Sequence, residues 1–309
     1  MIYEFALDPE VISDWNLFRL FYDKFGIPQG RLIAQFPKRW KKLVYEAVER
    51  NEKSEINKKR IVERLNSADS RLWRKERQYN PEVSWLLNAV EQHELLPFHA
   101  IISNENQSNS DRILLAEEVD ENTELWNIPV MKFGSRKAIH LTQFASALLS
   151  LSKEVIFVDP HFKPDVRRFQ VTLELFLESA LTSGQHIKLI EYHVKRDEKD
   201  DYWNDFQTFK RVCENELPKH LPKGIKIKFI RWEERREGKK FHARYLLTDK
   251  GGLLIETGLD EGKTAEETPI ILLNHEMYGI VRKDFNSLQD MSISSYKYEN
   301  EFIIIGNKI

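Results

Sequence analysis

Short apolar runs alternate with longer segments of helical spacing from about residue 136 to the end of the chain. The runs EVIFVDP, HIKLIEYHV and IKIKFIRW have the length and the β-branched content of buried strands. Helical segments of roughly 10–15 residues separate them, which is typical of strand–helix–strand crossovers in a parallel or mixed sheet. We therefore predict an α/β fold, with a mixed β-sheet between helices over residues 135–309.

The first part of the chain, residues 1–134, has a different pattern. VISDWNLFRLFYDKF, WKKLVYEAVER and INKKRIVERL space their apolar residues three or four apart, as amphipathic helices do. FHAIIS and RILLAEE flank the polar stretch NENQSNSD and predict a hairpin with a long tip. At 309 residues the chain is long enough for roughly two domains. We predict a mainly helical amino-terminal module, with a break near 121–135.

Charge is balanced over the chain but not locally. Lys plus Arg number 47 against 49 Asp plus Glu, so no global attraction to nucleic acid or membranes is expected. Residues 38–77 hold 14 Lys plus Arg against 7 Asp plus Glu. This excess makes a candidate nucleic-acid-binding face, although helices rich in Lys and Glu are more often simply solvated. The residues of this candidate face are Lys41, Lys42, Lys58 and Arg60.

Cysteine usage and the lack of a targeting pattern favour a cytoplasmic protein. Cys213 is the single cysteine, and the first 30 residues lack the basic-then-apolar pattern of a signal peptide. No apolar run approaches the roughly 20 residues that span a bilayer. The other histidine-containing segments lack metal-ligand spacing, and GLDEGKT has one residue too few for a P-loop. We therefore expect no membrane span, no metal and no cofactor.

The stretch FHARYLLTD, residues 241–249, places a histidine and an arginine on a predicted strand. Alternate side chains of a strand share a face, so His242 and Arg244 point the same way with Cα atoms roughly 6.5–7 Å apart. An imidazole can attack phosphorus or protonate a leaving oxygen, and a guanidinium can clamp the non-bridging oxygens. The pair therefore suits phosphodiester chemistry; the alternative is a structural histidine on an edge strand.

His242-Ala-Arg244, followed after four residues by Asp249, resembles the HxKx4D element of the phospholipase D superfamily. EVIFVDPHF resembles the strand and turn that open many such domains, and NHE at 274–276 stands where a family asparagine and glutamate often follow. The resemblance covers roughly residues 136–309. It implies a catalytic set and a substrate-binding pair. The catalytic set is His242, Arg244, Asp249 and Glu276, and the substrate-binding pair is Thr257 and Asn274.

His161, in VDPHFKP, is a third substrate-binding candidate. It follows a predicted strand, at the end where α/β sheets place ligands, so we expect it to line the same pocket. The alternative is a turn residue beside Pro160.

Two departures separate this chain from the family pattern. Arg244 stands where family enzymes usually have lysine, and a planar guanidinium does not replace an ammonium group freely. Family members also tend to carry a Gly-Ser-x-Asn run after the next strand, where this chain has ETGLDEG, with Thr257 in place of the serine and Asp260 near the asparagine. HxR with GLD after the next strand is also similar to the non-catalytic, membrane-binding domain at the carboxyl end of some MIT-domain proteins.

The resemblance implies a metal-independent phosphodiesterase, and we expect a nuclease. In such enzymes one histidine becomes a phosphohistidine and another protonates the leaving group. We expect a homodimer because only one HxR element is visible, and a setting in a prokaryotic defence or mobile-element system with protein partners. The alternative is a catalytically inactive phospholipase D-like module that binds nucleic acid, anionic lipid or a protein partner within a larger complex. A pure scaffold is a third reading.

Overall fold

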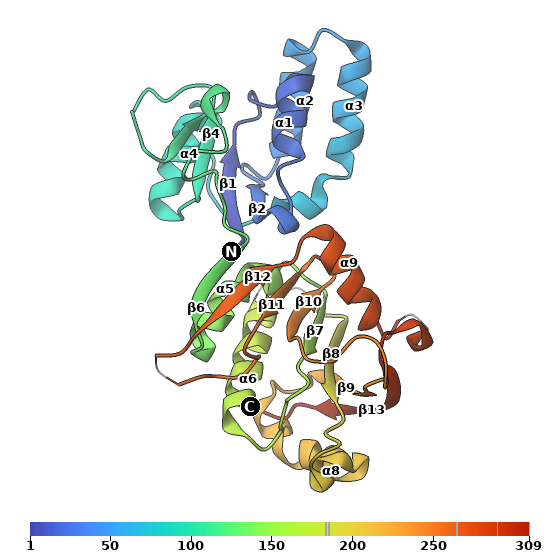
Figure 1. Ribbon diagram of the computed structural model, residues 1–309. Helices are drawn as coiled ribbons and strands as arrows, with labels where there is room; N and C mark the ends of the chain where they lie inside the picture. The colour runs from blue at the N-terminus through green and yellow to red at the C-terminus, as the bar shows by residue number, and fades with distance from the viewer. Residues whose placement is uncertain (183, 185, 264, 289, 309) are drawn as a thin grey trace. The chain divides into compact units, whose positions relative to one another are not determined.

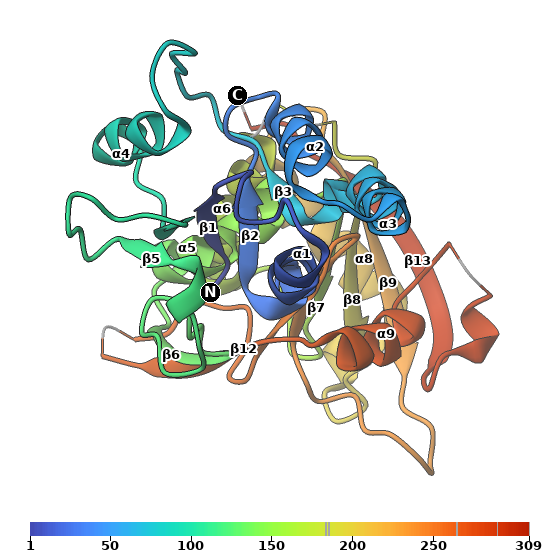
Figure 2. The same ribbon diagram turned by 90° about the horizontal axis from the view of Figure 1, so that it is seen from above.

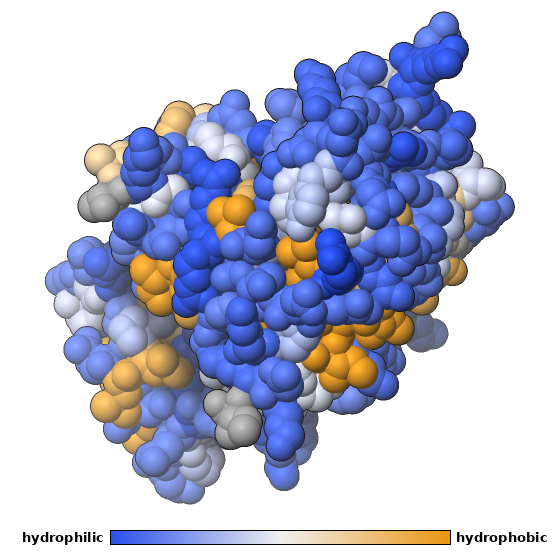
Figure 3. Space-filling view, turned by 90° about the horizontal axis from the view of Figure 1, so that it is seen from below, coloured by the Kyte–Doolittle hydropathy of each residue, from blue (hydrophilic) through white to orange (hydrophobic). Residues whose placement is uncertain are grey.

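The computed structural model describes residues 1–182, 184, 186–263, 265–288 and 290–308 (Figure 1). The chain divides into two compact units, Met1–Pro129 and Val130–Ile309. The sequence placed this boundary at 134–135. None of the described helices is both long and apolar enough to cross a membrane. The molecular face in Figure 3 is mainly hydrophilic, and its apolar side chains form separate small patches.

The first unit is built on a parallel sheet. Its strand order is β3-β2-β1-β4-β5, and every neighbouring pair is parallel. The strands are β1 (Tyr3–Leu7), β2 (Arg31–Ala34), β3 (Leu72–Trp73), β4 (Ala100–Ser103) and β5 (Ile113–Leu115). The helices are α1 (Trp15–Tyr22), α2 (Trp40–Asn51), α3 (Glu55–Asn66) and α4 (Trp85–Leu95).

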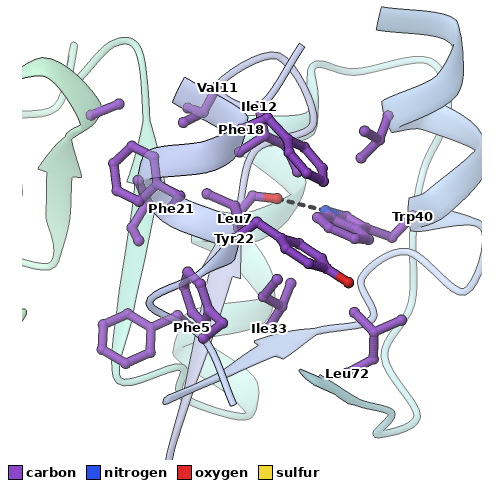
Figure 4. Close-up of a cluster of buried hydrophobic side chains, with 14 of the residues drawn as sticks. Phe5, Leu7, Val11, Ile12, Phe18, Phe21, Tyr22, Ile33, Trp40 and Leu72 are labelled. Atoms are coloured by element: carbon purple, nitrogen blue, oxygen red, sulfur yellow. Dashed lines mark hydrogen bonds between the residues drawn. The ribbon is translucent and has the colours of Figure 1, made fainter. Parts of the chain in front are cut away.

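Helices cover both faces of this sheet (Figure 2). Apolar side chains of α1, α2 and α3 pack with β1 and β2 in one buried cluster, and α4 packs in a second cluster that contains Ala6 and Ile101. In the first cluster the Trp40 side chain is fully buried, and its indole N–H donates to the Leu7 carbonyl over 2.7 Å (Figure 4). This bond satisfies the one polar atom of the largest side chain in the core.

Two expectations for this unit are corrected. The helical prediction missed the sheet, because strands of two to five residues are too short to show a strand period. The predicted hairpin is wrong, since β4 and β5 pair in parallel, with Ile101 opposite Ile113. The polar stretch between the two strands is longer than either strand, so it can return the chain to the start of β4.

The second unit contains a mixed sheet in the order β13-β9-β8-β7-β10-β11-β12-β6. β7, β8 and β9 are parallel, and the other neighbouring pairs are antiparallel. The strands are β6 (Met131–Ser135), β7 (Glu154–Val158), β8 (Leu189–Lys195), β9 (Lys226–Glu233), β10 (Tyr245–Thr248), β11 (Gly252–Ile255), β12 (Glu267–Leu272) and β13 (Lys297–Ile305). The helices are α5 (Ala138–Ser150), α6 (Arg167–Thr182), α7 (Asp201–Asn204), α8 (Phe206–Glu216) and α9 (His275–Asp284).

Helices also cover both faces of this sheet. On one face Phe157 of β7 stacks on Phe176 of α6, with ring centroids 5.9 Å apart, and α5 lies beside α6 (Figure 1). On the other face Val281 of α9 and the adjacent Phe285 pack on β7, β9 and β10. The predicted α/β class is therefore confirmed, with a mixed sheet between helices in this unit.

Candidate functional site

One edge of the second sheet collects the ends of four neighbouring strands. β7, β8 and β9 run parallel, so their carboxyl ends meet at this edge. β10 is antiparallel to β7 and therefore starts where the others end, with Tyr245 paired to Val158. Ligands of open α/β sheets bind outside the carboxyl ends of the strands. Segments 159–163 and 241–244 therefore meet where the fold favours a ligand site.

The imidazole rings of His161 and His242 lie against each other at this edge. Their centroids are 5.6 Å apart and their planes meet at 86°, an edge-to-face arrangement. Extending the β7–β10 register beyond Val158 and Tyr245 puts His242 opposite His161, which explains the contact. Both residues are accessible to solvent, and His161 is partly buried. Two imidazoles at this spacing can address one phosphate group from two directions.

Arg244 lies on the same face of the chain as His242. Its Nη1 donates to the carbonyl of Glu256 over 3.0 Å, and its own carbonyl accepts the N–H of Ile255 over 3.0 Å. Within the described ranges Arg244 forms no salt bridge, and its buried Nε has no hydrogen-bond partner. A guanidinium with N–H groups to spare, beside two imidazoles, is suited to hold an anionic oxygen.

Asp159 is buried behind these side chains. Its Oδ1 accepts the backbone N–H of His161 over 2.9 Å, and its Oδ2 accepts that of Leu259 over 3.1 Å. Burial raises the pKa of Asp159 to about 6, although the two hydrogen bonds and the charge of Arg244 act in the opposite direction. The carboxyl group therefore joins two loops of the site and is ionised at neutral pH.

The protein environment favours the neutral form of the His161 imidazole by lowering its pKa. Partial burial is the largest cause that lowers the pKa of His161 below its usual value. The positive charge of Arg244 lowers it further, and Lys195 and His242 act in the same direction. Asp197 opposes them with a smaller effect. At pH 7 a histidine of this kind is a base rather than an acid, until an anion binds beside it.

Thr257 reaches the same edge from β11. The β10–β11 register pairs Tyr245 with Leu254, and its extension places Thr257 opposite His242, on the side away from His161. Thr257 is exposed, and its backbone N–H donates to Oγ1 of Thr268 over 3.3 Å. Its hydroxyl is therefore placed where it can contact a ligand held by His242.

The loop after Thr257 depends on a glycine and a buried carboxylate. Gly258 has φ +130°, and an added Cβ would lie 2.4 Å from Oδ1 of Asp260. Asp260 is itself held by Nη2 of Arg136 at 2.9 Å and by Nε of Arg168 at 3.2 Å. Asp260 is thus paired with two arginines, and Arg136 also pairs with Glu266 at 2.8 Å.

Asp249 does not join this site. It follows the carboxyl end of β10, whereas His242 precedes the amino end of that strand. Its Oδ1 accepts the backbone N–H groups of Lys153 over 2.7 Å and Glu154 over 3.1 Å. The expected catalytic role beside His242 is therefore corrected: the carboxylate fixes the start of β7 at the opposite edge of the sheet.

Asn274 and Glu276 also lie away from His242. Asn274 is the N-cap of α9, where its Oδ1 accepts the N–H of Met277 over 2.8 Å. Glu276 is exposed in the first turn of the same helix. Tyr278 of α9 donates its hydroxyl to the Thr248 carbonyl over 2.6 Å, which ties this helix to the carboxyl end of β10. Capping and the helix dipole account for both residues at these positions.

Two of the four residues of the candidate nucleic-acid face are engaged with carboxylates. Lys42 of α2 lies 3.4 Å from Glu46, one helical turn away. Lys58 of α3 forms two salt bridges of 3.0 Å, with Glu49 and Glu55. Such local pairs reduce the positive field that a polyanion would meet.

Arg60 and Lys41 complete this face. Arg60 lies over the Trp15 ring, with Cζ 5.5 Å from its centroid. Lys41 is half-buried in the first turn of α2. Trp40 is fully buried, so its ring is closed to stacking with bases. These contacts favour the alternative reading of the region as a solvated helical face.

A cavity of about 460 Å³ adjoins the imidazole pair. His161 forms part of its wall, together with residues that follow β7, β8 and β9. Lys195, at the end of β8, lines this cavity and also lowers the pKa of His161.

Asp159 and Lys195 were missed from the sequence. Each stands at or just beyond the carboxyl end of a predicted strand, which is the signal that pointed to His161. Among the described residues no group of three or more His, Cys, Asp or Glu side chains could hold a metal ion.

No protein-family model matches this sequence, and no curated protein or solved structure matches it either.

Proposed function

We propose that the Val130–Ile309 unit is a metal-independent phosphodiesterase that acts on nucleic acid, with His242, His161 and Arg244 as its catalytic residues. The observation that carries the proposal is the His161–His242 ring pair, with centroids 5.6 Å apart, beside an arginine that forms no salt bridge in the described ranges. Nucleophile, proton donor and phosphate clamp are then available within a single chain. The resemblance of His242-Ala-Arg244 to the phospholipase D element supports the same chemistry.

In the first half of the reaction His242 attacks phosphorus. An N–P bond forms while the bond from phosphorus to the leaving oxygen breaks, and the leaving alkoxide takes the proton of the His161 imidazolium. In the second half water attacks phosphorus, neutral His161 accepts a proton from that water, and the N–P bond breaks. The products are an alcohol and a phosphomonoester, and both imidazoles return to their starting state.

Arg244 binds the non-bridging oxygens through both halves of this reaction, since its charge is not consumed by a salt bridge. The bound diester also supplies a negative charge beside His161. This charge raises the pKa of His161 from its lowered value, so the proton is present when the leaving oxygen needs it. Asp159 is a positioning residue, because it holds the His161 backbone.

Family enzymes combine two histidine motifs, and the sequence suggested a homodimer for that reason. In this chain His161 provides the second imidazole, so we propose that each chain forms its own site whatever its oligomeric state. A setting in prokaryotic defence rests on the resemblance alone.

A second candidate is phosphate binding without cleavage. It is favoured by one observation: among the described residues no carboxylate accepts a hydrogen bond from the ring of His161 or His242. Catalytic imidazoles are usually oriented by such a partner. The same cluster would then dock nucleic acid, anionic lipid or a protein partner.

The experiment uses the full chain in excess chelator, with single- and double-stranded DNA and RNA oligonucleotides. Wild type is compared with His242→Ala and with His140→Ala, a control at an exposed histidine of α5. Chelator-resistant cleavage that is lost only in His242→Ala supports the enzyme. Oligonucleotide binding without cleavage, weakened in His242→Ala, supports the binding module. Cleavage that needs a divalent metal, or that persists in His242→Ala, overturns the mechanism.

A further inference from the structure

The cavity beside His161 has walls from three successive strand ends. They are the turn after β7, the segment 195–200 with α7 after β8, and the end of β9. At about 460 Å³ it lies within the range of roughly 300–1,000 Å³ that small-molecule sites occupy. Its aromatic lining residues are Phe162, Trp203 and Phe209.

Trp203 presents a fixed aromatic surface to this cavity. It is half-buried on α7, and Phe209 meets it edge to face at 6.3 Å between centroids. Asp200 caps α7 by accepting the N–H groups of Tyr202 over 3.1 Å and Trp203 over 3.5 Å. Tyr202 packs edge-on against Trp203 at 5.0 Å. Lys163 Nζ also lies over the ring, 5.4 Å from its centroid. These neighbours fix the orientation of the ring, and a flat ligand that stacks on it must share the ring with the Lys163 ammonium or displace it.

The charges of the cavity are largely balanced. Lys195 Nζ lies 3.3 Å from Glu234, and Lys163 Nζ lies 3.7 Å from Asp200. The buried Arg231 is paired with Glu299 at 2.6 Å. A cavity with paired cations gives little reason to hold a second phosphate. It does offer polar groups to the edge of a heterocycle and an aromatic face to its plane.

His161 connects the cavity to the reacting centre, because its ring contacts His242 and its residue also lines the cavity. A phosphate held against the two imidazoles therefore lies beside the cavity that Trp203 also lines, within reach of a group attached to that phosphate. We infer that the cavity binds the base of the nucleotide that carries the scissile phosphate, with the base stacked on Trp203. This inference rests on the proposed function and gives it a substrate class: nucleotide diesters rather than lipid diesters.

The test measures binding and cleavage separately, on the full chain in excess chelator. The binding probes are thymidine 5′-monophosphate, adenosine 5′-monophosphate and methyl phosphate. Isothermal titration calorimetry measures the Kd of each. The variants are Trp203→Ala and Trp203→Phe. Phe133→Ala, at a 63 % exposed phenylalanine of β6, is the matched control. Circular dichroism checks that each variant is folded.

We expect the Kd of at least one nucleotide to rise about tenfold in Trp203→Ala and to be largely kept in Trp203→Phe and Phe133→Ala. Methyl phosphate should bind equally weakly to all four proteins. The inference is overturned if neither nucleotide binds wild type more tightly than methyl phosphate does, or if Trp203→Ala leaves both nucleotide constants unchanged.

Cleavage of a dinucleotide distinguishes this inference from the proposed function. If nucleotides bind in a way that depends on Trp203 but no dinucleotide is cleaved, the base-binding cavity is supported and the phosphodiesterase activity is contradicted. If cleavage depends on His242 but not on Trp203, the phosphodiesterase activity is supported and the base-binding cavity is contradicted.

Discussion

His161 follows β7 and His242 precedes β10, and their rings meet edge to face with centroids 5.6 Å apart. The antiparallel register of β7 and β10 produces this contact. It pairs Val158 with Tyr245, and three residues further along each chain segment it places His161 opposite His242. A second imidazole is thus available without a second chain.

The first prediction is that both imidazoles of a site come from the same chain. His161→Ala and His242→Ala should each lose cleavage of oligonucleotides, and an equimolar mixture of the two variants should stay inactive, because each chain still lacks one imidazole. The measurement is the cleavage rate of each variant and of the mixture after joint refolding. If the mixture recovers a substantial fraction of wild-type activity, the site is shared between chains.

A second prediction separates the two histidines by leaving group. A nucleoside alkoxide needs a proton as it departs, whereas p-nitrophenolate does not. His161→Ala should therefore lower the rate of phosphohistidine formation by about 100-fold with a dinucleotide as substrate. With the p-nitrophenyl ester of thymidine 5′-monophosphate the same rate should fall far less. His242→Ala should lose both. Burst kinetics measure the first half-reaction, and equal losses on the two substrates in His161→Ala would contradict its role as the acid.

The pH dependence follows from the same assignment. Since the pKa of His161 lies below its usual value, the proton donor is lost from the free enzyme as pH rises through that range. kcat/KM for a dinucleotide should therefore fall as pH rises through this lowered range, and kcat/KM for the nitrophenyl ester should not show the same decrease. If kcat/KM decreased with pH in the same way for both substrates, the decrease would have to come from a group other than His161.

Several parts of this site were accessible from the sequence. The two-residue period of an extended chain predicted that His242 and Arg244 share a face, and the position after a strand pointed to His161. The failure at Asp249 also has a physical reason. Seven residues of extended chain span roughly 20 Å, so a motif that runs from 242 to 249 cannot gather both ends at one phosphate.

Other parts could not be predicted. The order β8-β7-β10, which brings His161 beside His242, is set by long-range pairing that no local pattern encodes. Asp159 could have been noticed at its strand end, but its contact with Leu259 depends on a loop 100 residues further along the chain. The parallel sheet of the first unit was missed because its strands are short and lie between stronger helical patterns.

Asp159 provides a prediction on stability. Its pKa is raised to about 6 in the folded chain, so the folded state binds the proton more tightly than the unfolded state. The contribution of Asp159 to the free energy of unfolding is therefore greatest below about pH 4 and is lost as pH rises to about 6. Asp159→Asn removes this titration. The free energy of unfolding of the variant, relative to wild type, should increase by roughly 2–3 kcal/mol between pH 4 and pH 7. Urea unfolding at both pH values measures it, and a constant difference would contradict the raised pKa.

Gly258 provides a prediction on the loop that places Thr257. Gly258→Ala adds a Cβ 2.4 Å from Oδ1 of Asp260 at φ +130°, so the loop must move and cleavage should drop. Gly238→Ala is the matched control, since Gly238 has φ +103° but no atom within 4 Å of an added Cβ. The two variants share backbone strain and differ in the collision. Equal cleavage rates in both would show that the collision near the site has no effect.

The central claim is that His242 forms a covalent bond to phosphorus without a metal. The most direct measurement is intact-protein mass spectrometry, with fragmentation, after reaction with the p-nitrophenyl ester of thymidine 5′-monophosphate in excess chelator. Because His161 serves as the base in the second half-reaction, His161→Ala should accumulate a thymidylyl adduct on His242, wild type should show it transiently, and His242→Ala should show none. Turnover in wild type with no adduct in any variant, or an adduct that persists in His242→Ala, would contradict the account.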